Sequence, residues 1–129
     1  MQVASLFMEN ILSEPNGWMR AIDRQVAHVW MVRTFLKHSD EVQEDEELAT
    51  VHRDLYDFML ALGPPLEAKD QFEYLKIVRK KSVKLRRATE LFLQIQPEVS
   101  SHTNYQMAAV SLEVAVQEIM RLADMAAAS

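Results

Sequence analysis

The chain has 129 residues, of which 49% are hydrophobic and 26% charged, and its formal net charge is −5. This length and composition indicate one globular domain with enough apolar residues for a buried core. The absence of cysteine excludes disulfides, thiolate metal sites and cysteine nucleophiles. Two glycines are too few for the many tight turns of an all-β fold, so long helices are favoured.

The sequence gives no indication of a membrane protein. No apolar run approaches the roughly 20 residues that a bilayer requires. The first residues lack a positively charged segment ahead of a sustained apolar stretch, so they do not resemble a signal peptide. We therefore expect a soluble, cytoplasmic protein that does not contact membranes.

Residues 1–16 form an N-terminal segment that is separate from the rest of the predicted fold. Val3, Leu6, Phe7 and Ile11 recur at helical spacing, which allows a short helix that docks on the body or on a partner. Pro15-Asn16-Gly17 then breaks the chain. Residues 17–129 are predicted to form a single domain.

Four helices are predicted within that domain, at about 17–38, 41–62, 67–96 and 102–126. Apolar residues recur three or four positions apart in each of them. Gly63-Pro64-Pro65 is predicted to end the second helix, and Pro97 the third. Because short loops make successive helices antiparallel, the expected fold is all-α, an up-down-up-down four-helix bundle with a short N-terminal helical segment.

Two charged runs of opposite sign occur in the second and third predicted helices. Residues 76–87 contain seven cations, and residues 40–47 contain six carboxylates. A turn at Gly63-Pro64-Pro65 would bring Glu44 level with Leu85, so that the runs lie flank to flank. The charges would then partly cancel, and nucleic-acid binding is not expected. If the cations instead point outward, nucleic-acid binding becomes the alternative.

The first long helix has a wider apolar arc than one small bundle can cover. Met19, Trp30 and Met31 extend this arc around the helix. We therefore predict a homodimer or a higher homo-oligomer with this helix and the N-terminal segment at the interface.

Polar residues from several helix ends are expected to meet at one end of the bundle. His38, Glu41, Glu44 and His102 are the candidate metal ligands there, and a hydrolase using a zinc-like ion is one alternative function. The sequence lacks the Glu-x-x-His pairs of di-iron bundles and the His-x-x-x-His spacing of helical zinc sites. No cofactor is therefore expected.

One acidic pattern resembles the all-α nucleotide pyrophosphohydrolases of the MazG type. Glu41-x-x-Glu44 and Glu67-x-x-Asp70 are similar to the paired carboxylates that hold magnesium between helices in that family. The resemblance covers these four positions only. The predicted hairpin separates the two pairs by about 20 Å along the bundle, too far to share one ion.

A second pattern, Arg33-Thr-Phe-Leu-Lys-His38, resembles the Arg-x4-6-His signature of the HEPN-type helical ribonucleases. The resemblance implies a dimeric bundle in which Arg33 binds the scissile phosphate and His38 acts as general acid or base. In that family the motif lies late in the chain, whereas here it ends the first long helix. Pairing of Arg33 with Glu44 or Asp45, with His38 as a cation at the helix C-terminus, is the preferred interpretation.

The sequence therefore favours a helical bundle that acts by self-association or by binding a protein partner. The alternative is an enzyme, either a metal-dependent hydrolase or a HEPN-like ribonuclease. A bundle that binds a small apolar molecule beside Phe58, Met59 and Trp30 is the third possibility.

Overall fold

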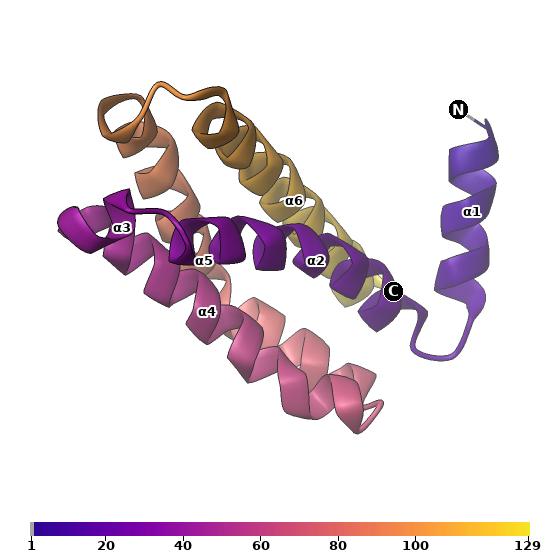
Figure 1. Ribbon diagram of the computed structural model, residues 1–129. Coiled ribbons are helices and arrows are strands. Elements are labelled where there is room, and N and C mark those ends of the chain that lie inside the picture. Colours follow the sequence, from indigo (N-terminus) through magenta and orange to yellow (C-terminus); the bar gives the residue numbers. More distant parts are fainter. Residues whose placement is uncertain (1) are drawn as a thin grey trace.

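The computed structural model describes residues 2–129, and the side chains of residues 8–129. Its helices are α1 (Gln2–Ser13), α2 (Gly17–Lys37), α3 (Glu41–Glu44), α4 (Glu46–Glu67), α5 (Gln71–Val99) and α6 (Thr103–Ala128). The long helices α2, α4, α5 and α6 pack antiparallel to their neighbours (Figure 1). None of the described helices is long and apolar enough to cross a membrane.

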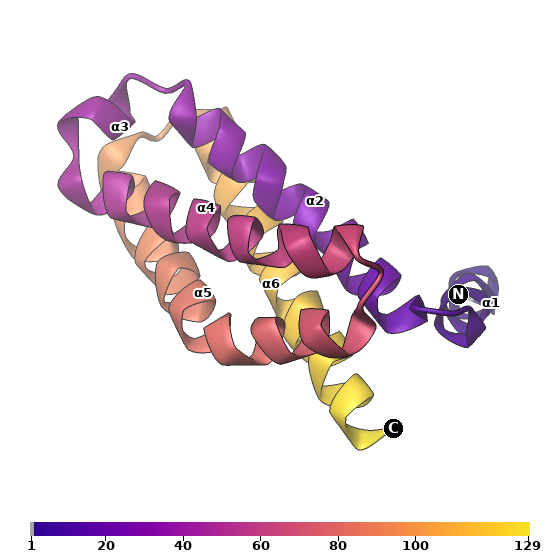
Figure 2. The same ribbon diagram turned by 90° about the horizontal axis from the view of Figure 1, so that it is seen from below.

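The four long helices form a closed ring around one core. α2 packs on α4, α4 on α5, α5 on α6, and α6 packs extensively on α2 (Figure 2). Side chains from all four helices fill the centre, among them Ile22, Leu55, Phe92 and Leu112, which are all at most 2% exposed. The predicted all-α, up-down-up-down four-helix bundle is confirmed.

Helix α1 contacts the bundle through its C-terminal end. Ile11 is buried against the core, and Arg20 of α2 forms an ion pair with Glu14 in the connection. The rest of α1 stands apart from the four long helices (Figure 1). Val3, Leu6 and Phe7 lie outside the residues whose side chains are described.

The end of α4 differs from the prediction. The helix continues through Gly63-Pro64-Pro65 to Glu67. Proline usually forces the preceding residue out of the helical conformation through a clash with that residue's Cβ and N–H. Gly63 has no Cβ, and Pro65 is buried, so local strain is lowered and packing supports the last turn.

The chain reverses instead at residues 68–70. Lys69 adopts a left-handed conformation with φ of 55°, and Asp70 caps α5 by accepting a hydrogen bond from the Glu73 N–H at 3.1 Å. The reversal thus comes about five residues later than predicted. Each residue of α4 therefore lies beside a different part of α5 than the sequence predicted.

The predicted meeting of the acidic and basic runs is therefore wrong. Lys84 lies 3.6 Å from Asp54 and 3.7 Å from Asp57, which belong to the middle of α4. The acidic run lies in α3 and the first turn of α4, further along the bundle. No ion pair joins the two runs within residues 8–129.

Several side chains also differ from their predicted positions. Phe72 fits the apolar spacing of the third predicted helix, which predicts that it points inward, but it is 74% exposed, and Tyr74, two residues later, is buried. Met19, predicted to widen the exposed apolar arc, is buried. Pro97 does not end its helix, because α5 continues to Val99.

Candidate functional site

An aromatic and cationic cluster lies on the side of the bundle where α2 and α4 meet. Trp30 and Arg33 are one turn apart on α2, and Tyr56 comes from α4. The Arg33 guanidinium carbon is 4.7 Å from the centroid of the Tyr56 ring and 5.7 Å from that of Trp30. Such distances permit cation–π attraction to both rings. Trp30 nevertheless remains 54% exposed.

A groove of about 350 Å³ runs beside this cluster. Its walls come from α2 and α4 and are apolar apart from one carboxylate; the lining residues are Asp23, Val26, Ala27, Trp30, Met59, Leu62, Gly63 and Leu66. Leu60, 61% exposed, follows Tyr56 by one turn on α4. We call the surface made by Trp30, Arg33, Tyr56, Leu60 and this groove the α2–α4 face.

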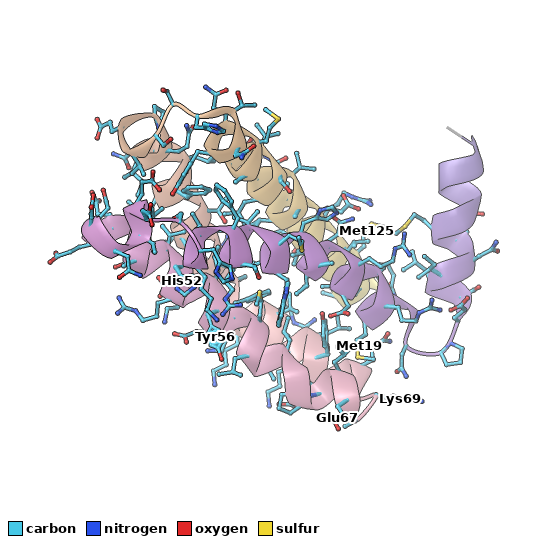
Figure 3. All side chains as sticks on the ribbon, in the orientation of Figure 1. Met19, His52, Tyr56, Glu67, Lys69 and Met125 are labelled. Atoms are coloured by element: carbon cyan, nitrogen blue, oxygen red, sulfur yellow. The ribbon has the colours of Figure 1, made fainter. Side chains whose placement is uncertain are left out.

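His52 lies one turn before Tyr56 on α4, as Figure 3 shows. Burial lowers the pKa of the His52 imidazole, and the charges of Arg33 and Lys37 lower it further. The His52 Nε2 and the Arg33 Nε are both buried without a hydrogen-bond partner. The cluster therefore contains a histidine that stays neutral near pH 7, next to two cations.

We expect His52 to make the protein less stable as the pH falls. Its pKa in the folded state lies below the value of about 6.5 in the unfolded chain, so the unfolded state takes up the proton first. The contribution of neutral His52 is complete above about pH 6.5 and is lost as the pH falls through the folded-state pKa. Urea unfolding of native protein and His52→Gln at about pH 7.5 and about pH 5.5 measures this effect. Identical pH dependence of the two proteins would contradict it.

The structure does not bring together the two residues of the HEPN-like pattern within one chain. Arg33 faces α4, whereas His38 is the exposed C-cap residue of α2. Five helical residues correspond to about 140° around the axis, so the two side chains point in different directions. The predicted pairing of Arg33 with Glu44 or Asp45 is wrong. Among the described residues Arg33 forms no ion pair with either carboxylate but contacts the two rings, and Asp45 caps α4 through the Leu48 N–H at 2.9 Å.

The polar bundle end holds its predicted residues in separate interactions. Glu41 accepts a hydrogen bond from the Tyr105 hydroxyl at 3.0 Å, while burial, together with the hydrogen bond to Glu41, raises the pKa of Tyr105. His102 caps α6, because its Nδ1 accepts the Asn104 N–H at 3.0 Å. Within the described residues, His38, Glu41, Glu44 and His102 do not form a group of three or more that would hold a metal ion.

The four carboxylates of the MazG-like pattern lie at opposite ends of α4. Glu41 and Glu44 belong to α3, while Glu67 and Asp70 flank the reversal after α4. Helix α4 has 22 residues, which corresponds to about 33 Å at 1.5 Å per residue. The separation is larger than the sequence suggested, and one ion cannot bridge the two pairs.

Sequence reasoning identified Trp30 and Arg33 but missed Tyr56 and Leu60. Both missed residues lie off the apolar stripe of their helix, and that position was the available signal.

Comparisons of the chain with protein-family models, with curated proteins and with solved structures yield no match.

Proposed function

We propose that this chain is a protein-binding helical bundle that self-associates through the α2–α4 face, with Trp30 as the central contact. The supporting observation is a half-exposed tryptophan next to an arginine, a tyrosine and an apolar groove. Tryptophan, tyrosine and arginine are the residue types that contribute most to binding energy in protein interfaces. Cysteine-free composition agrees with a reducing compartment, and we propose the cytoplasm.

The shape of the α2–α4 face favours a second copy of the chain as the partner. The face carries both a protruding ring, Trp30, and an apolar groove bounded by Met59 and Leu66. In a two-fold symmetric contact the same face is used twice, so each copy can place its ring against the groove of the other. Exposed Leu60 would lose contact with water in the same arrangement.

Light scattering of the purified protein tests this proposal. We expect native protein to be a dimer at micromolar concentration. Trp30→Ala should weaken association at least about 30-fold, which corresponds to the roughly 2 kcal/mol of a central interface residue. Phe72→Ala is the matched control, because it removes an aromatic residue that is 74% exposed on α5. Its dimerisation should equal that of native protein.

Two results would overturn the proposal. A monomeric mass for native protein at about 100 µM would exclude useful self-association. A dimer that is equally stable with Trp30→Ala would place the interface elsewhere. Circular dichroism spectra of both variants should match the native spectrum, which shows that the bundle remains folded.

A further inference from the structure

Four exposed cations follow the outer side of α5. Lys76, Arg79, Lys80 and Arg87 recur at helical spacing on the side opposite the buried core residues of that helix, which include Leu75, Val78 and Leu85. We call these four cations the α5 basic surface. From Lys76 to Arg87 the helix rises about 16 Å.

The four cations of the α5 basic surface have no carboxylate within ion-pair distance among the described residues. Lys84, on the flank towards α4, forms ion pairs with both Asp54 and Asp57. None of the four cations forms an ion pair with another residue of the described chain. Residues 76–87 hold seven cations and no carboxylate, whereas the rest of the chain holds the other seven cations and all 19 carboxylates. Positive charge is therefore concentrated in this stretch of α5.

We infer that the α5 basic surface binds single-stranded nucleic acid. Phosphates of one strand are spaced about 3.4 Å along a helix axis, so about 16 Å of cationic surface spans roughly five of them. Phe72 lies one turn before Lys76 on the same side of α5 and is 74% exposed. An exposed ring at the end of a cationic track is a platform on which a base stacks.

The exposed ring favours nucleic acid over an acidic protein segment. Carboxylates, including those of residues 40–47 in a second copy, would match the cations of α5 but would give Phe72 no stacking partner. The carboxylates on the other helices repel phosphate, so they confine a bound strand to α5 and restrict its affinity. Binding is thus expected to be local, sequence-tolerant and strongly dependent on salt.

Fluorescence anisotropy with a labelled oligothymidylate of about 15 nucleotides tests the inference. For four phosphate contacts, the logarithm of the binding constant should fall against the logarithm of salt concentration with a slope of about −3. The double variant Lys80→Glu with Arg87→Glu should bind at least tenfold more weakly, and its slope should be shallower by about 1.4. Lys37→Glu with Arg53→Glu is the matched control, because it also replaces one exposed lysine and one exposed arginine. It should lose less than about threefold.

A third variant separates base stacking from charge. Phe72→Ala should weaken oligothymidylate binding at least about fivefold, from the loss of one stacked base. Its binding to inorganic polyphosphate, which has no bases, should equal that of native protein.

Three results would overturn the inference. The first is no anisotropy change at about 50 mM salt and about 100 µM protein. The second is an equal loss of affinity in the two double variants. The third is a native assembly whose mass falls with Lys80→Glu and Arg87→Glu while native protein does not bind the oligonucleotide, which would make α5 a contact between copies.

Discussion

Replacing Tyr74 with alanine is expected to lower the free energy of unfolding by about 3–5 kcal/mol. Tyr74 is fully buried in α5, and its hydroxyl donates a hydrogen bond to Asp23 Oδ1 of α2 at 3.1 Å. Burial raises the pKa of this hydroxyl, and the Asp23 carboxylate raises it further, so the group remains a donor throughout the usual pH range. Alanine would remove the ring from the core and leave a cavity.

Tyr74→Phe separates the ring from the hydrogen bond. It keeps the buried ring, so its cost should be about 0.5–1.5 kcal/mol, because water can reach half-buried Asp23 in place of the hydroxyl. Urea unfolding followed by circular dichroism gives both values. Phe72→Ala is the control, since its ring is 74% exposed and its loss should cost less than about 1 kcal/mol. Equal costs for Tyr74→Ala and Phe72→Ala would contradict the position of Tyr74 in the core.

The two glycines should differ in how strongly they resist replacement by alanine. A Cβ on Gly17 would lie 2.2 Å from the Ile11 carbonyl oxygen and 2.8 Å from the Leu12 Cα. Both are backbone atoms that no side-chain rotation can move away, so Gly17→Ala should cost about 1–3 kcal/mol and shift α1 relative to α2. A Cβ on Gly63 would meet no atom within 4 Å beyond its chain neighbours, but it would clash with the ring of the following Pro64. Gly63→Ala should therefore change the free energy of unfolding by less than about 1 kcal/mol, because this clash opposes the gain in helix propensity.

Urea unfolding of the two glycine variants measures these two changes. Hydrogen exchange locates the first one, because the amides at the end of α1 should exchange faster in Gly17→Ala and at the native rate in Gly63→Ala. If Gly17→Ala cost no more than Gly63→Ala, the close approach of α1 to α2 would be contradicted.

The helices of the bundle were predictable because their apolar residues keep a regular spacing. Leu48, Val51, Leu55, Phe58 and Leu62 follow one face of α4, and all of them are buried as that spacing requires. The position of the α4–α5 reversal was not predictable by the same reasoning. Glycine followed by two prolines usually stops a helix, and burial of Pro65 against the bundle outweighs that local tendency here.

Because the reversal was misplaced, the predicted meeting of the acidic and basic runs was wrong as well. An antiparallel pair of helices is matched level by level, so a shift of a few residues in the turn changes every partner along the pair. Lys84 consequently meets Asp54 and Asp57, while the acidic run around Glu44 lies elsewhere. The exposure of the cations on α5 is therefore seen in the structure and could not be predicted from the composition.

Only part of the α2–α4 face could be predicted from the sequence. Trp30 was identified because it widens the apolar arc of α2. Tyr56 lies off the apolar stripe of α4, so the spacing that identifies core residues did not single it out. Its role depends on how α2 and α4 are rotated against each other, which brings its ring to 4.7 Å from Arg33. Tertiary packing decides that rotation.

The closure of the ring by α2 and α6 has a consequence for how the molecule folds. The α4–α5 and α5–α6 hairpins join neighbours in the chain and form through short-range contacts, which are quick to establish. The contact between α2 and α6 instead joins the first and last long helices of the chain. Forming it costs the entropy of closing a long loop. We expect this contact to assemble last and to be where the native bundle first opens.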